Sequence, residues 1–167
     1  YDNLGRLISA SQSGHLLSYA YDQLNRNTTA TSPLGTVAYQ YDGAGRRTRI
    51  TWPGGFYVDY DFLVTGEMEK ARENGATSGA GVLATNAYDN LGRRISVARG
   101  NGVTTTLAFD GLSRLTSLTQ DPGATTHDQT WTFSHSPASQ IAGQTSANGL
   151  YNWTVGTDFS NAYTDNG

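Results

Sequence analysis

The strongest constraint in this sequence is a short motif that returns about every 20 residues. The motif reads aromatic-Asp-x-x-Gly-Arg, and its copies begin near residues 1, 21, 41, 60, 88, 109 and 133. Helical-pair repeats need units of roughly 33 residues or more, so this unit is too short for them. One β-hairpin fits the length. The period therefore predicts a series of hairpins along residues 1–167, taken as a single repeat segment.

Each copy combines an aromatic residue, an aspartate, a residue that tolerates positive φ, and an arginine. The motif residues are Tyr1, Asp2, Gly5, Arg6, Tyr21, Asp22, Asn25, Arg26, Tyr41, Asp42, Gly45, Arg46, Tyr60, Asp61, Tyr88, Asp89, Gly92, Arg93, Phe109, Asp110 and Arg114. The copy at Tyr60-Asp61 is stretched, with Gly66-Glu67 in place of Gly-Arg. We expect a degenerate repeat after residue 151 and a chain that is a piece of a longer protein.

The motif predicts a hairpin tip. Aspartate is favoured at the first position of a type I turn, and glycine at the fourth supplies the left-handed residue of a bulge. Asn25 suits that position, whereas Ser113 predicts mild strain or a different turn. The arginine can reach back to the aspartate, an exposed pair worth about 0.5 kcal/mol.

The residues between the tips predict strands. Leu17, Tyr19 and Tyr21 alternate along one face, and Gly/Pro turns such as Ser13-Gly14 close the opposite ends of the hairpins. We therefore predict an all-β fold, a curved antiparallel meander of about seven to eight hairpins with about fourteen to sixteen strands. Such a strip leaves strand edges open at its ends.

Residues 65–74 could form either a helix or a strand. Their composition favours helix, and Glu69 and Glu73 lie four residues apart. The register of the repeat instead favours a charged strand, followed by a loose loop over residues 75–81. We predict the strand.

Composition excludes several classes of protein. The chain has no cysteine, so it has no disulfide framework and no thiolate. Its net charge of −3 argues against binding nucleic acid through phosphate neutralisation. No apolar run approaches the roughly 18 residues of a membrane-spanning helix. An aromatic content of 11% argues against disorder.

Residues that could carry chemistry have structural explanations. His15, His127 and His135 match no metal-ligand spacing. The repeated aspartates form one row of turn residues, whereas paired catalytic carboxylates converge across a cleft. The sequence contains no nucleophile elbow and no phosphate loop. We therefore predict no catalytic residues, no metal site, no cofactor and no enzymatic activity.

Tryptophans leave one binding hypothesis open. Trp52, Trp131 and Trp153 could stack on sugars at an exposed sheet face. Aromatic side chains also stabilise sheets through cross-strand pairs, which is the competing explanation.

The motif resembles the Rhs or YD-repeat family over nearly the whole chain. In that family such repeats build a β-sheet strip that spirals into a hollow shell. Bacterial Rhs polymorphic toxins and the cocoon components of insecticidal toxin complexes enclose a toxin in this shell, and animal teneurins use a similar one. The core region that closes those shells, and in several members cleaves itself, is absent here, as is a toxin domain.

The resemblance implies a structural segment of a secreted or surface-exposed bacterial shell that encloses or presents a toxin cargo. The expected partners are neighbouring repeats of the same or an identical chain, with the cargo and glycans as further partners. An alternative is the subunit of an extracellular fibre, assembled end to end through open strand edges. A carbohydrate-binding sheet surface is the second alternative.

Overall fold

A computed structural model describes residues 1–123 and 126–151 of the 167 residues. These residues form strands and two short 3₁₀ helices, η1 (Gly79–Gly81) and η2 (Gly149–Tyr151). The strands are β1 (Ser9–Gln12), β2 (His15–Tyr21), β3 (Asn27–Ser32), β4 (Gly35–Tyr41), β5 (Arg47–Thr51), β6 (Tyr57–Phe62), β7 (Met68–Glu73), β8 (Val82–Tyr88), β9 (Arg94–Ala98), β10 (Thr104–Phe109), β11 (Leu115–Asp121), β12 (Gln129–His135) and β13 (Ile141–Ser146).

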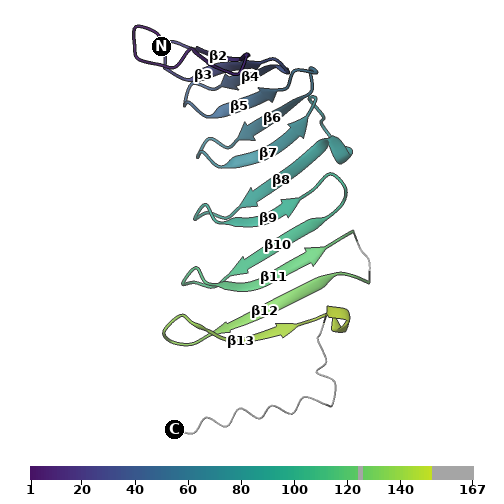
Figure 1. Cartoon of the computed structure of the whole chain (residues 1–167). Helices are drawn as coiled ribbons and strands as arrows, with labels where there is room; N and C mark the ends of the chain where they lie inside the picture. Colours follow the sequence, from purple (N-terminus) through teal and green to yellow (C-terminus); the bar gives the residue numbers. More distant parts are fainter. Residues whose placement is uncertain (124–125, 152–167) are drawn as a thin grey trace. The chain divides into compact units, whose positions relative to one another are not determined.

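The strand order follows the chain order from β1 to β13, and the order does not close. Antiparallel pairing joins the consecutive strands β1 to β9, and likewise β11 to β13. The predicted all-β meander of hairpins is confirmed, with 13 strands in the described part of the chain (Figure 1). The chain divides into two compact units, Tyr1–Thr105 and Thr106–Gly167.

Residues 65–74 do not form a helix. The segment Met68–Glu73 is strand β7, paired with β6 and β8. The predicted strand is confirmed for residues 68–73, where Arg72 forms an ion pair with Asp61 of the neighbouring strand β6. No described helix is long and apolar enough to cross a membrane.

The two faces of the first unit differ in chemistry. Tyr39 lies opposite Ile50, which lies opposite Val58, so apolar side chains gather on one face. The neighbouring register places Arg49 opposite Asp59 on the other face. This alternation follows from the two-residue period of a strand.

Very little of the sheet is buried. Among the described residues the buried apolar side chains are Val58 and Ala71, at the centre of the first unit. The buried polar residues are Asp59, Asn86 and Gln129. Hydrogen bonds and cross-strand side-chain pairs therefore bear a large share of the stabilisation in this sheet.

Candidate functional site

Seven five-residue tips recur along the chain: residues 2–6, 22–26, 42–46, 63–67, 89–93, 110–114 and 136–140. The first precedes β1, and each of the other six joins two consecutive strands. In each tip, the first N–H donates to the fifth carbonyl, and the fourth N–H donates to the first carbonyl. At residues 42–46 these distances are 2.9 Å and 3.1 Å. This is a type I turn with a left-handed fourth residue, as the motif predicts.

Residues other than glycine occupy the left-handed position in three tips. Asn25 has φ 63°, Ser113 has φ 63° and Ser139 has φ 62°. Of the two alternatives predicted at Ser113, mild strain or a different turn, the structure excludes the different turn, because residues 110–114 make the same backbone bonds as the other tips. The cost is a serine held at positive φ.

The aspartate at the first position holds its own tip together. One carboxylate oxygen of Asp22 accepts the backbone N–H groups of Leu24 and Arg26, both at 2.9 Å. The other oxygen accepts Nε of Arg26 at 2.7 Å. The tips at Asp2, Asp42, Asp89 and Asp110 repeat this pattern.

These bonds lower the pKa of the tip aspartates. At Asp22 the backbone N–H of Arg26 is the largest cause, and partial burial opposes it. At Asp42 the Arg46 side chain is the largest cause. The carboxylates are therefore ionised at neutral pH and are fully engaged as acceptors.

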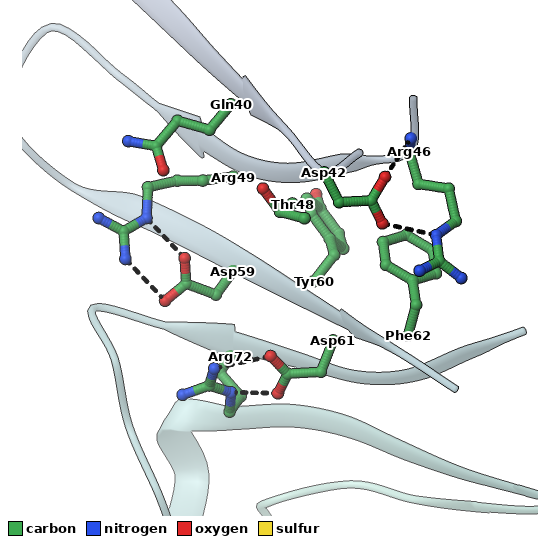
Figure 2. Close-up of a pocket in the computed structure, with 10 residues that line it drawn as sticks. All are labelled: Gln40, Asp42, Arg46, Thr48, Arg49, Asp59, Tyr60, Asp61, Phe62 and Arg72. Atoms are coloured by element: carbon green, nitrogen blue, oxygen red, sulfur yellow. Dashed lines mark hydrogen bonds and ion pairs between the residues drawn. The ribbon is translucent and has the colours of Figure 1, made fainter. Parts of the chain in front are cut away.

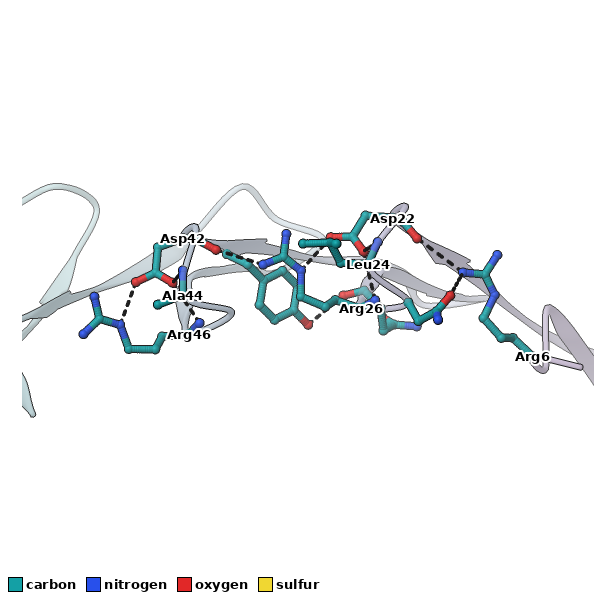
Figure 3. A network of polar contacts seen from close by, with 10 residues as sticks. Arg6, Asp22, Leu24, Arg26, Asp42, Ala44 and Arg46 are labelled. Atoms are coloured by element: carbon teal, nitrogen blue, oxygen red, sulfur yellow. Dashed lines mark hydrogen bonds and ion pairs between the residues drawn. The ribbon is translucent and has the colours of Figure 1, made fainter. Parts of the chain in front are cut away.

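The arginine reaches beyond its own tip. Nη1 of Arg26 donates to the carbonyl of Asp42 in the next tip at 2.8 Å, and its guanidinium lies 4.7 Å from the centre of the Tyr41 ring (Figure 3). Arg6 makes the same contacts to Asp22 and Tyr21. The sequence predicted the pair with the aspartate but missed this link between repeats.

Two further arginines follow the same pattern. Arg46 donates to the carbonyl of Leu63 at 3.0 Å and lies 4.7 Å from the Phe62 ring. In the second unit, Arg114 donates to the carbonyl of Ser136 at 3.3 Å. We call this row of tips, joined by arginines, the tip ladder.

The tyrosine of the motif adds a second link. The hydroxyl of Tyr41 donates at 2.8 Å to the carbonyl of Asn27, which directly follows the arginine of the preceding tip. Tyr21 donates in the same way to Leu7 and Tyr88 to Met68, both at 2.9 Å. The pairs Tyr21-Asp22, Tyr41-Asp42 and Tyr88-Asp89 thus each belong to two repeats, since the hydroxyl bonds the residue after the previous tip and the carboxylate bonds its own tip.

Two tips lie two residues further along than the sequence pattern predicts. Tyr60-Asp61 does not form a tip, because both residues belong to β6, and the turn occupies residues 63–67. Phe133 likewise lies within β12, and the turn occupies residues 136–140. The turn follows the left-handed residues Gly66 and Ser139 rather than the aromatic residues.

Asp61 instead belongs to a charged cluster on the sheet face (Figure 2). It accepts Nε and Nη2 of Arg72 at 2.6 Å and 2.8 Å, and Asp59 accepts the same atoms of Arg49 at 2.6 Å and 3.1 Å. The aspartate bonds raise the pKa of both arginines. Alternating Arg49, Asp59 and Arg72 on three successive strands was the sequence signal, and it was missed.

This cluster lines an open cavity of about 480 Å³. Its lining residues are Gln40, Asp42, Arg46, Thr48, Arg49, Asp59, Tyr60, Asp61, Phe62 and Arg72. Each of its three arginines pairs with an aspartate. The guanidinium groups and carboxylates of this cavity are thus engaged with one another.

The histidines are dispersed along the chain. His15 begins β2, His127 lies in the turn before β12, and His135 ends β12. Within residues 1–123 and 126–151, no group of three or more His, Asp or Glu side chains could hold a metal ion.

The tryptophans lie in different settings. Trp52 starts a turn at the opposite end of the hairpins from the tips, where its ring lies 5.4 Å from that of Phe56. Trp131 lies in β12, opposite Leu118 and Ser146. Trp153 lies outside the described residues. Their contact with glycans stays a prediction.

The fold and the tip ladder together define an open sheet of hairpin repeats. The family model described as RHS Repeat matches residues 27–56, which contain the tip at 42–46, and residues 88–126, which contain the tips at 89–93 and 110–114. These two segments of the chain are therefore similar to the RHS repeat. A search among curated proteins finds no match.

Solved structures share this fold. The crystal structure of TcdB2-TccC3 superposes with a TM-score of 0.69 at 18% identity, over 90% of this chain. That of TcdB2-TccC3-TEV gives 0.67 at 17% identity, also over 90%. That of TcdB2-TccC3-Cdc42 gives 0.69 at 16% identity. This chain covers 9% of the chain in each of the three.

Proposed function

We propose that the chain is a non-catalytic structural segment of an RHS-type shell, secreted or exposed on a bacterial surface, which encloses or presents a toxin cargo. The family match and the shared fold support a shell segment. The observation that carries the proposal is the tip ladder, since its arginines and tyrosines join each repeat to the next. The function that we assign to the motif is therefore to connect neighbouring repeats through these arginines and tyrosines.

The charged residues of the sheet fit this role. The tip aspartates and the cluster around Asp59 hold their arginines in bonds that fix the repeats. An enclosing wall needs rigid connections between neighbouring hairpins and needs no reactive group. The ladder supplies these connections along one edge.

The experiment is negative-stain electron microscopy of the whole parent protein, purified from its natural source. The shell predicts closed hollow particles. Long uniform fibres would instead support assembly between chains and would contradict the shell. Particles without an internal cavity would contradict both assemblies.

Cargo enclosure needs its own measurement. A polypeptide that co-purifies with the particles should survive protease while the particles are closed and be degraded after acid opens them. An inert protein added from outside is the matched control and should be degraded in both conditions. A co-purifying polypeptide that is degraded at once would contradict enclosure, even if the particles are hollow.

A further inference from the structure

One tip of the first unit departs from the ladder. Residues 63–67 make the same backbone turn as the other tips, with bonds of 2.8 Å and 3.0 Å. Leu63 stands in the place of the aspartate, and Glu67 stands in the place of the arginine. In the arginine-linked tips described above, the arginine at this fifth position reaches the next tip through its guanidinium group. At residues 63–67 the same position carries the carboxylate of Glu67.

The neighbouring tip, residues 89–93, has the features that receive a guanidinium at other junctions. Tyr88 supplies an aromatic ring in the position of Tyr21 and Tyr41. Its hydroxyl still donates to the carbonyl of Met68, so the ring is held as in the other repeats. The carbonyl of Asp89 accepts Gly92 N–H, just as that of Asp42 accepts Gly45 N–H beside the Arg26 bond.

A cavity of about 480 Å³ lies between these two tips, lined by Leu63, Thr65, Glu67, Tyr88 and residues 89–92. Glu67 rests against the neighbouring tip, since a β-carbon on Gly92 would lie 3.0 Å from its Oε1. Oε2 of Glu67 is buried and has no hydrogen-bond partner among the described residues. Thr65 and Leu91 are exposed, so the cavity opens to solvent.

Burying an acceptor without a donor costs free energy, and more so for a charged acceptor. The neighbouring Thr65 hydroxyl and the backbone N–H of Glu67 itself lower the pKa of the Glu67 carboxyl. The carboxylate is therefore ionised at neutral pH. A planar cation with several N–H donors would satisfy it.

We propose that this junction, formed by Glu67, Tyr88 and the Asp89 carbonyl, is a binding site for the guanidinium group of an arginine that does not belong to the tip ladder. The three elements match the surroundings of Arg26, which pairs with a carboxylate, lies over a tyrosine ring and donates to a tip carbonyl. At the junction the carboxylate comes from Glu67 instead of the aspartate of the arginine's own tip. The site is independent of whether the parent protein forms a shell.

The test is a titration of the ¹⁵N-labelled chain with N-acetyl-arginine amide, followed by amide chemical shifts at constant ionic strength. We expect saturable shifts at residues 90–92. Residues 43–45 are the internal control, because Arg26 already fills the equivalent place. The matching lysine amide is the control for charge, and a Gly-Arg-Gly peptide distinguishes a polypeptide source from a free guanidinium compound.

Two variants separate binding from folding. Glu67→Gln should raise the dissociation constant about tenfold, since it removes the charged acceptor and keeps its shape. Glu69→Gln, on the following strand, is the matched control and should leave the dissociation constant unchanged. Glu67→Arg should place a guanidinium from the chain itself in the site and abolish binding of the probe.

Circular dichroism verifies that each variant keeps its strands. Equal shifts at residues 43–45 and 90–92 would overturn the proposal. So would equal affinity for the lysine amide, or unchanged binding by folded Glu67→Gln or Glu67→Arg. Tighter binding of the peptide than of the amide would assign the guanidinium to a polypeptide; equal binding would assign recognition to the guanidinium alone.

Discussion

The tips at residues 42–46 and 63–67 have the same backbone and different side chains. Both close the same two hydrogen bonds, and both place a glycine at positive φ in the fourth position, Gly45 and Gly66. Only the first carries the Asp42–Arg46 pair. The comparison teaches that the left-handed residue specifies the turn, whereas the aspartate and arginine serve the contacts around it.

The difference extends to the neighbouring repeat. Arg46 reaches the carbonyl of Leu63, so the second tip receives a link from the first. Glu67 cannot donate to the tip that follows it, because a carboxylate is only an acceptor. The ladder therefore continues into residues 63–67 through an arginine, whereas Tyr88 and Asn86 link the following repeat by donating to the carbonyl of Met68.

The largest expected effect is the loss of a linking arginine. Arg26→Ala removes bonds within and between tips and the contact with Tyr41, and should lower the free energy of unfolding by about 2 kcal/mol. Urea unfolding followed by circular dichroism measures it. Arg99→Ala is the matched control, because Arg99 contacts Thr105 in an exposed position at the other hairpin end. Equal losses in both variants would contradict the ladder.

The role of the left-handed residue can be tested within one tip. Gly45→Ala should cost about 1.5 kcal/mol, because alanine disfavours the φ of 84° found there. Gly43→Ala is the control, since its φ is not positive and a β-carbon meets nothing within 4 Å at either glycine. Thermal melts of both variants measure the difference. A neutral Gly45→Ala would refute the assignment of the turn to its fourth residue.

The tyrosine link should contribute less. Tyr41→Phe keeps the ring beneath Arg26 and removes the bond to the Asn27 carbonyl, for a loss of about 1 kcal/mol. Tyr39→Phe is the matched control, since no hydrogen bond of its hydroxyl is found in the described part of the chain. Chemical denaturation compares the two. If both variants unfold alike, the hydroxyl of Tyr41 does not connect the repeats.

Restoring the aspartate and the arginine of the motif at residues 63–67 should remove the difference between this tip and residues 42–46. The double variant Leu63→Asp/Glu67→Arg recreates the pair of residues 42–46 and places a guanidinium beside Tyr88. It should stabilise the chain by about 0.5 kcal/mol, the scale of an exposed ion pair with a cation–π contact. A melting temperature unchanged or lowered in a folded variant would show that the surroundings of residues 63–67 do not accept the motif.

Acid should weaken the tips that carry aspartate. The pKa of Asp42 is lowered from its ordinary value of 3.8 in the folded chain. The unfolded chain therefore binds protons first, and the stabilisation present above 3.8 is lost as the pH falls through the folded pKa. Asp42→Asn keeps an acceptor and cannot titrate, so its melting temperature should fall less between about pH 6 and about pH 2. Parallel curves would contradict this.

The sequence predicted the meander well because each tip carries its own turn chemistry. It misplaced the tips near residues 60 and 133 because the aromatic residue was taken as the marker. At Ser136-Pro137, proline after serine is itself typical of a type I turn and would have located that tip. At residues 63–67, Gly66 was already assigned to the glycine position of the motif, and counting back from it locates the tip.

The links between tips were beyond sequence reasoning. The spacing from Arg26 to Asp42 is 16 residues, and nothing in it states that the two lie on adjacent tips until the strands are paired. The charged face of the sheet could have been predicted, since Asp59 lies opposite Arg49 and Arg72 on its two neighbouring strands and Asp61 lies opposite Lys70 on one of them. The strand register then decides which basic residue each aspartate meets.

The scarcity of buried apolar side chains has a thermal consequence. Exposure of apolar surface is what raises the heat capacity on unfolding, and in the described residues only Val58 and Ala71 are buried apolar residues. The heat-capacity increment per residue should therefore fall below the roughly 12–15 cal/mol/K of ordinary globular domains. A smaller increment flattens the dependence of stability on temperature. Scanning calorimetry of this sheet should thus show a broad, shallow stability curve. Cooling should lower its stability less than that of a protein with a large apolar core.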